Sequence, residues 1–110
     1  MLEGKSKKDF RDYYIQTEGL QTKTIESQRL ELLLFYAMSE SKQYGVLVDW
    51  FDSVGVDIEL LIDYNIHTNI LKGFFYDISE NNCSKTFKTR PQARQQAIKK
   101  ANQIYNERTT

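Results

Sequence analysis

The chemistry open to this chain is narrow, because its 110 residues include one cysteine, Cys83, and one histidine, His67. A cysteine–histidine pair acts as nucleophile and base only when further groups orient and activate it, and the sequence marks none. Structural zinc needs three or four Cys or His ligands. The five glycines are scattered, so there is no phosphate-binding loop. The sequence therefore predicts no catalytic residue, metal site or cofactor, and we expect a non-enzymatic protein.

A row of carboxylates, Asp57, Glu59 and Asp63, alternates with apolar residues over positions 56–64. Such a row can hold a hard cation or supply an acid–base pair. Alternating carboxylates are far more typical of the solvated face of a β-strand, and we interpret the row in that way.

The formal net charge of zero conceals a segregation of charge along the chain. The 15 basic and 15 acidic residues balance overall. Residues 25–82 carry three basic and ten acidic groups, whereas residues 83–110 carry seven basic groups and one acidic group. This pattern favours internal pairing, head-to-tail association, or binding of an anion by the basic end.

The basic end contains the candidate contacts for nucleic acid or another anion. These are Lys85, Lys88, Arg90, Arg94 and Lys99. Arg90 and Arg94 stand one turn apart at the start of a predicted helix, where positive charge opposes the helix dipole. That arrangement indicates a partner, either a phosphate or a carboxylate of the acidic middle segment. Since such carboxylates lie in the same chain, we favour internal or intersubunit pairing over nucleic acid.

Two helices are predicted between residues 24 and 54, in preference to one bent helix. Thr24 is a good N-cap, and the leucines after it follow the i, i+3, i+4, i+7 spacing of a face that packs inward. That stripe comprises Leu30, Leu33, Leu34, Ala37 and Met38, and a second apolar set comprises Tyr44, Leu47, Val48 and Phe51. Gly55 is predicted to end the helical region in a Schellman cap, with Val56 and Phe51 as its apolar pair.

The apolar period changes to two after Gly55, which predicts strands over 56–64, 70–78 and 83–88. Short turns between successive strands imply an antiparallel meander. A last helix is predicted to begin at Thr89 with a capping box to Gln92. Its predicted inner face is Ala93, Ala97, Ala101, Ile104 and Tyr105.

These elements predict a single α+β domain over residues 24–110, of order α-α-β-β-β-α. Its helices are expected to pack on one face of a three-stranded antiparallel sheet. We interpret residues 1–23 as an N-terminal arm, in which Phe10, Tyr13, Tyr14 and Ile15 could form a short helix.

The far face of the predicted sheet carries the candidate interface residues Leu61, Leu71 and Phe75. A wholly solvated face should not hold that much apolar surface. We therefore expect either the N-terminal arm or a second subunit, as a homodimer or another protein partner, to cover this face.

The expected compartment is the cytoplasm. A lone cysteine fits a reducing environment. The first residues lack the apolar stretch of a secretory signal, and no apolar run approaches the ~20 residues that span a bilayer, so no membrane partner is predicted.

The order helix, three antiparallel strands, helix resembles the double-stranded-RNA-binding domain, over about 60 residues. The last helix of that family opens with Lys-Lys-x-Ala-Lys, and the matching stretch here is Arg90-Pro91-Gln92-Ala93-Arg94. Pro91 replaces the middle basic residue, and His67 lies in the hairpin turn where that family carries a histidine loop. The resemblance implies that fold more than that function.

A second resemblance is to small uncharacterised proteins of bacterial prophages and mobile elements, over roughly residues 44–106. It rests on the run from Trp50 to Gly55 and on the helix from Thr89 to Asn106. That family implies no site residue. From all these features we expect a protein-interaction or self-associating module, with a nucleic-acid-binding accessory protein as the alternative.

Overall fold

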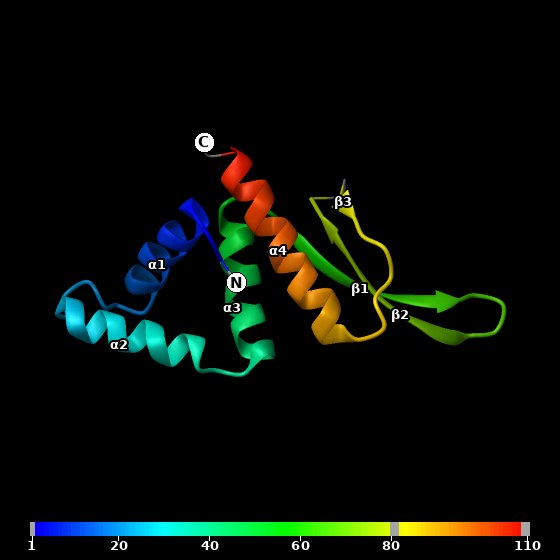
Figure 1. Ribbon diagram of the computed structural model, residues 1–110, viewed down its shortest axis with the longest axis horizontal. Helices are drawn as coiled ribbons and strands as arrows, with labels where there is room; N and C mark the ends of the chain where they lie inside the picture. The colour runs from blue at the N-terminus through cyan, green and yellow to red at the C-terminus, as the bar shows by residue number, and fades with distance from the viewer. Residues whose placement is uncertain (1, 80–81, 109–110) are drawn as a thin grey trace.

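The computed structural model describes residues 2–79 and 82–108 as an elongated body of 57 × 30 × 18 Å (Figure 1). Its helices are α1 (Lys5–Thr17), α2 (Ile25–Tyr36), α3 (Glu40–Ser53) and α4 (Arg90–Arg108), and its strands are β1 (Ile58–Asn65), β2 (Ile70–Ile78) and β3 (Asn82–Cys83). The strands form one antiparallel sheet of order β1-β2-β3. The predicted α+β class and antiparallel meander are confirmed, and α1 extends the element order to α-α-α-β-β-β-α.

The region from 24 to 54 contains two helices, as preferred from the sequence. The Thr24 side chain caps α2 by accepting a hydrogen bond of 3.2 Å from the Ser27 amide. Between α2 and α3, the buried Gln43 amide donates to the carbonyls of Tyr36 (3.0 Å) and Met38 (2.9 Å). These carbonyls lie at the end of α2, where they have no partner within the helix, so Gln43 fixes the turn between the two helices.

The predicted Schellman cap ends α3. The Val56 amide donates to the Phe51 carbonyl (2.8 Å), and the Gly55 amide donates to the Asp52 carbonyl (3.1 Å). Gly55 has φ of 84°, a conformation that glycine adopts without a Cβ clash.

The sheet differs from the predicted one at its third strand. Regular pairing on that edge covers Asn82–Cys83, and the predicted turn at 80–82 lies partly outside the described residues. Beyond Cys83, Ser84 bonds to Tyr76 through both its amide and its hydroxyl, and Phe87 forms an isolated bridge with Phe74. The side-chain bond takes the place of a backbone pair, so the segment after Cys83 follows β2 without a regular ladder.

A glycine on β2 makes the close approach of this edge segment feasible. A Cβ on Gly73, whose φ is 153°, would stand 2.2 Å from the Phe87 carbonyl oxygen. The edge segment is also bonded to the cross-strand partner of Gly73, because the Thr86 hydroxyl donates to the Asp63 carboxylate on β1 at 2.6 Å.

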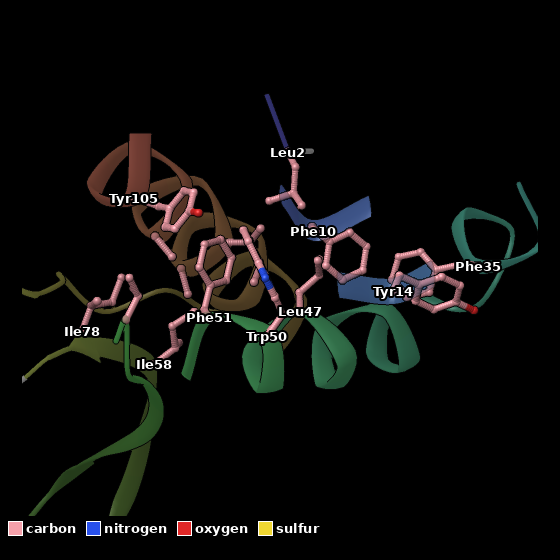
Figure 2. Close-up of a cluster of buried hydrophobic side chains, with 14 of the residues drawn as sticks. Leu2, Phe10, Tyr14, Phe35, Leu47, Trp50, Phe51, Ile58, Ile78 and Tyr105 are labelled. Carbon is pink, nitrogen blue, oxygen red and sulfur yellow. The ribbon is translucent and has the colours of Figure 1, made fainter. Parts of the chain in front are cut away.

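The core lies where α1, α3 and α4 meet the start of the sheet (Figure 2). Phe10, Phe35, Leu47, Trp50 and Phe51 are its large fully buried members. On α4, most of the predicted inner face is confirmed, because Ala93, Ala97 and Ala101 are fully buried and Tyr105 is nearly so. Ile104 is only partly buried, and the buried Ile98 was not predicted. The Gln92 amide donates to the Thr89 hydroxyl at 3.3 Å, which is the first half of the predicted capping box.

The N-terminal segment is part of this core. Leu2, Phe10, Tyr14 and Leu20 are buried with the residues of α3 and α4. The segment is also tied to α4 by Asn106, which accepts from the Ser6 amide (2.9 Å) and donates to the Glu3 carbonyl (2.8 Å). Since α1 packs against α3 and α4 at the end of the molecule away from the hairpin, it does not cover the far face of the sheet (Figure 1).

Candidate interaction surfaces

Helix α2 carries an exposed apolar stripe, which we call the leucine face. It consists of Leu30, Leu33 and Leu34 of α2 and of Ala37 and Met38 directly after the helix; its four large side chains are 56%, 67%, 52% and 41% exposed. The prediction that this stripe packs inward is wrong. The side chain that α2 buries is Phe35, whose ring centre lies 5.3 Å from that of Phe10 and 5.1 Å from that of Tyr14 (Figure 2). Because the leucine face lies on the other side of the helix from Phe35, burying the ring turns the leucines to solvent.

The exposed apolar surface of α2 extends beyond the leucine face. Ile25 and Tyr36 are also exposed, and Leu32 is partly buried against the core. These side chains lie on different sides of the helix, and the exposed charged residues Glu26 and Arg29 lie between them, so they do not form one patch. The leucine face alone presents on the order of 400 Å², comparable with the largest patches on typical monomers.

A groove of about 600 Å³ runs between α1 and α2, and we call it the α1–α2 groove. Its lining residues are Gly4, Lys7, Lys8 and Arg11 from the α1 side and Arg29, Leu32, Leu33 and Tyr36 from α2. Both sets follow the i, i+3, i+4, i+7 spacing, so each helix turns one face to the groove. One wall is therefore basic, and the other is mainly apolar.

The cations of this groove have no partner within the described chain. Lys7, Lys8, Arg11 and Arg29 are exposed, and none of them forms an ion pair or hydrogen bond there. On another face of α1, Asp9 pairs with Lys5 at 3.4 Å. This basic face is hidden in a count of charge along the sequence, because the acidic residues of the first 24 positions nearly cancel it; the helical spacing of Lys7, Lys8 and Arg11 is the signal that identifies it.

The apolar wall of the groove ends at Tyr36. Burial raises the pKa of the Tyr36 phenol above its usual 10.0, so the side chain is neutral at physiological pH. Tyr36 thus offers a hydroxyl group at the end of an apolar row without adding charge.

The candidate interface on the sheet is divided by a β-bulge. Leu61 and Phe75 are cross-strand partners and are half-buried. The register shifts after Asp63, so that Leu71 pairs with Tyr64. This shift moves Leu71 to the face opposite Leu61 and Phe75, because inserting one residue reverses the alternation of side chains. The hairpin end is apolar and exposed, including Ile62, Tyr64, Ile66, Ile70 and Leu71.

Two of the candidate anion contacts are engaged within the molecule. The Arg94 guanidinium bonds to the Glu40 carboxylate at 3.1 Å and lies over the Tyr44 ring, 5.5 Å from its centre. Burial raises the pKa of Tyr44, and the nearby Arg94 charge opposes that rise. Arg90 lies over the Phe74 ring at 4.9 Å. Glu40 thus provides the carboxylate that the sequence offered as an alternative to phosphate.

The other candidate cations border a polar face of α4. Lys85, which lies over the Phe87 ring at 5.7 Å, is exposed, as are Lys88 and Lys99. Two open hollows beside these lysines share Gln95 and Gln96. The structure therefore places three of the five candidates around one amide-rich surface and turns Arg94 inward.

The residues considered for chemistry do not come together. Cys83 pairs with Asp77 near one end of β2, whereas His67 lies in the turn beyond the other end, roughly 20 Å away at the ~3.3 Å rise of a strand. Asp63 is bonded to Thr86, while Asp57 and Glu59 are exposed. Among residues 2–79 and 82–108, no group of three His, Cys, Asp or Glu side chains could hold a metal ion.

Asp9 and Tyr105 form the most strongly perturbed titratable pair. The Tyr105 hydroxyl donates a short hydrogen bond to the Asp9 carboxylate. This bond lowers the pKa of Asp9, with burial opposing and Lys5 assisting. Burial, followed by the bond to Asp9, raises the pKa of Tyr105 to about 12. The pair joins α1 to α4 and lies among core residues, so we assign it to stability.

Comparisons with protein-family models, curated protein sequences and solved structures found no match. Within the part of the chain that the structure describes, no helix is both long and apolar enough to cross a membrane.

Proposed function

We propose that this protein is a non-enzymatic interaction module that self-associates through the leucine face of α2. The observation that supports this is the exposure of Leu30, Leu33 and Leu34 at the spacing of a packed helix face. Large contiguous apolar patches on soluble proteins are typical of interaction sites.

A second copy of the chain is a suitable occupant because the leucine face is complementary to itself. Two copies related by a two-fold axis would bring leucines of α2 against leucines of α2, as in an isologous interface. Glu26 lies one turn before Leu30 on the same side of α2, so the pairing must leave this carboxylate at the solvated rim to avoid burying an ion. With on the order of 400 Å² from each copy, the total of about 800 Å² lies below the ~1,200 Å² of stable interfaces, so this contact should give a weak, concentration-dependent dimer.

Light scattering over a series of protein concentrations tests this proposal. We expect a mass near twice the 13.0 kDa of one chain, and a return to the single mass in Leu30→Glu/Leu34→Glu. Ile66→Glu is the matched control, because Ile66 is an equally apolar residue that is 91% exposed on the hairpin. A wild-type monomer at every concentration would overturn the proposal, as would dissociation by Ile66→Glu alone. Circular dichroism checks that each variant is folded.

A second candidate function is nucleic-acid binding through α4. It is favoured by the amide-rich surface around Gln95, Gln96 and Lys99, since amide and lysine side chains read base edges and contact phosphates. A salt titration with mixed-sequence duplex RNA and DNA tests it, because phosphate contacts make log affinity fall linearly with log salt. Absence of binding at low salt would eliminate this candidate. The lone exposed Cys83 agrees with placing either function in the cytoplasm.

A further inference from the structure

We infer that the α1–α2 groove binds an acidic, amphipathic helix of a partner protein. This site goes beyond self-association, because the groove opens on a different side of α2 from the leucine face. The two surfaces share Leu33 and no other residue. Each can therefore be disabled without the other.

The two walls of the groove define the chemistry of the occupant. From α1, the cations Lys7, Lys8 and Arg11 require a partner surface with negative charge. From α2, Leu32 and Leu33 require an apolar surface. A helix with one acidic face and one apolar face satisfies both walls at once, as in other complexes where an amphipathic helix lies in a groove.

The charge complementarity is specific because the cations of the groove are unpaired in the described chain. None of Lys7, Lys8, Arg11 and Arg29 forms an ion pair among the described residues, and Lys8 has only a through-space attraction to the Asp9 carboxylate. Opposite charges across an interface speed association and exclude partners of the wrong sign. A basic helix of the same shape should therefore be rejected.

The size of the groove also suits a short helical segment. The lining residues span two turns of each helix, from Gly4 to Arg11 and from Arg29 to Tyr36. At ~1.5 Å per residue, this length is about 10 Å, which accommodates apolar anchors at i, i+3 or i+4, and i+7.

The regular spacing of both walls favours a helix over an anionic membrane surface. Each wall repeats at the period of a helix, and the apolar wall ranges from Leu32, partly buried against the core, to the exposed Leu33, which is the relief that the spaced side chains of a helix can follow. Vesicle binding is nevertheless a distinct outcome of the test below.

Fluorescence anisotropy of the full chain with a labelled peptide tests the inference. The probe is a peptide of about 20 residues built from Leu-Glu-Glu-Leu-Leu-Glu-Gln heptads, and the matched probe carries Lys in place of every Glu. We expect the acidic probe to bind, the basic probe not to bind, and Lys8→Glu/Arg11→Glu to weaken the acidic probe at least about tenfold. Lys99→Glu/Lys100→Glu makes the same change of charge on α4 and should leave binding unchanged.

Several results would overturn the inference. The first is that the acidic probe does not bind, and the second is that Lys99→Glu/Lys100→Glu weakens its binding as much as Lys8→Glu/Arg11→Glu does. The third is that a peptide covering residues 24–38 binds more tightly than the acidic probe, which would make a second copy of the chain the occupant. Binding to phosphatidylglycerol vesicles, but not to the peptide, would make a membrane the partner. The Leu30→Glu/Leu34→Glu variant separates this site from self-association, because it should lose the dimer and keep the acidic probe.

Discussion

Phe35 of α2 and Phe10 of α1 are both fully buried, and their ring centres lie 5.3 Å apart. Phe10 in turn lies 5.6 Å from Trp50 of α3, edge to face. Through this chain of rings, Phe35 is the one fully buried side chain of α2, with Leu32 partly buried against the core, while most of the helix surface stays open. The attachment of α2 therefore depends on Phe35, and so does the orientation of the leucine face.

Replacing Phe35 with a small residue should destabilise the fold. Phe35→Ala leaves a cavity among Phe10, Tyr14 and Tyr36, and it should lower the free energy of unfolding by about 3–5 kcal/mol. Urea denaturation measures the loss. Ile66→Ala is the control, since a side chain that is 91% exposed should cost less than about 0.5 kcal/mol. Equal losses in the two variants would show that Phe35 does not anchor α2.

Gly73 and Gly45 should respond to the same substitution with opposite signs. Gly73→Ala places a Cβ 2.2 Å from the Phe87 carbonyl oxygen at a φ of 153°, so it should destabilise the fold by at least about 2 kcal/mol. Gly45 lies inside α3 with open space around its Cα, so Gly45→Ala should stabilise by about 0.5–1 kcal/mol. Thermal or urea unfolding of both variants compares them. A neutral Gly73→Ala would show that the edge segment can move away from β2.

The Asp9–Tyr105 hydrogen bond should give stability within a defined pH window. The pKa of Asp9 is lower in the folded protein than its value near 3.9 in the unfolded chain, so the ionised carboxylate stabilises the fold above about pH 3.9. This stabilisation is lost as pH falls through the pKa of Asp9 in the folded protein. The pKa of Tyr105 is raised to about 12 in the folded protein, so the protonated hydroxyl stabilises the fold below about pH 10. This stabilisation is lost as pH rises towards about 12. Tyr105→Phe should therefore cost about 1 kcal/mol near pH 7 and less below pH 4 or above pH 10.

Unfolding of wild type and Tyr105→Phe at pH 3, 7 and 10.5 measures this window. Tyr64→Phe is the control, because Tyr64 is exposed on the hairpin and should show no such dependence. A cost for Tyr105→Phe that stays constant from pH 3 to 7 would contradict the role of the Asp9 carboxylate.

The local features of the fold, such as its helix caps, were predicted well from the sequence, because each depends on residues that are close together in the chain. The Thr24 cap, the Schellman cap at Gly55 and the alanine face of α4 are all present in the structure. Periodicity also grouped Leu30, Leu33 and Leu34 correctly on one face of a helix. It could not tell which face of α2 meets the core, since that depends on the ring of Phe10 from another helix.

The candidate sites were harder to predict for the same reason. A one-residue bulge beside Gly73 moves Leu71 away from Leu61 and Phe75, and an isolated glycine within a strand was the available signal. The engagement of Arg94 by Glu40 depends on how α4 packs beside α3, and no local pattern reports it. The basic wall of the α1–α2 groove requires knowing that α1 and α2 lie side by side.

The sheet carries a pair of like charges, and reversing one of them should make the fold more stable. Glu59 on β1 and Asp77 on β2 are direct cross-strand partners, and one buried carboxylate oxygen of Asp77 has no hydrogen-bond partner within the described residues. Like charges placed opposite each other destabilise a sheet. Glu59→Lys should therefore raise the free energy of unfolding by about 0.5–1 kcal/mol, and the gain should shrink at high salt because ions screen the pair. Asp12→Lys makes the same change of charge on α1, which packs against α3 and α4, and should change stability by less than about 0.5 kcal/mol. Urea denaturation at low and high salt compares the variants, and equal gains in both would mean that overall acidity, rather than this pair, limits the sheet.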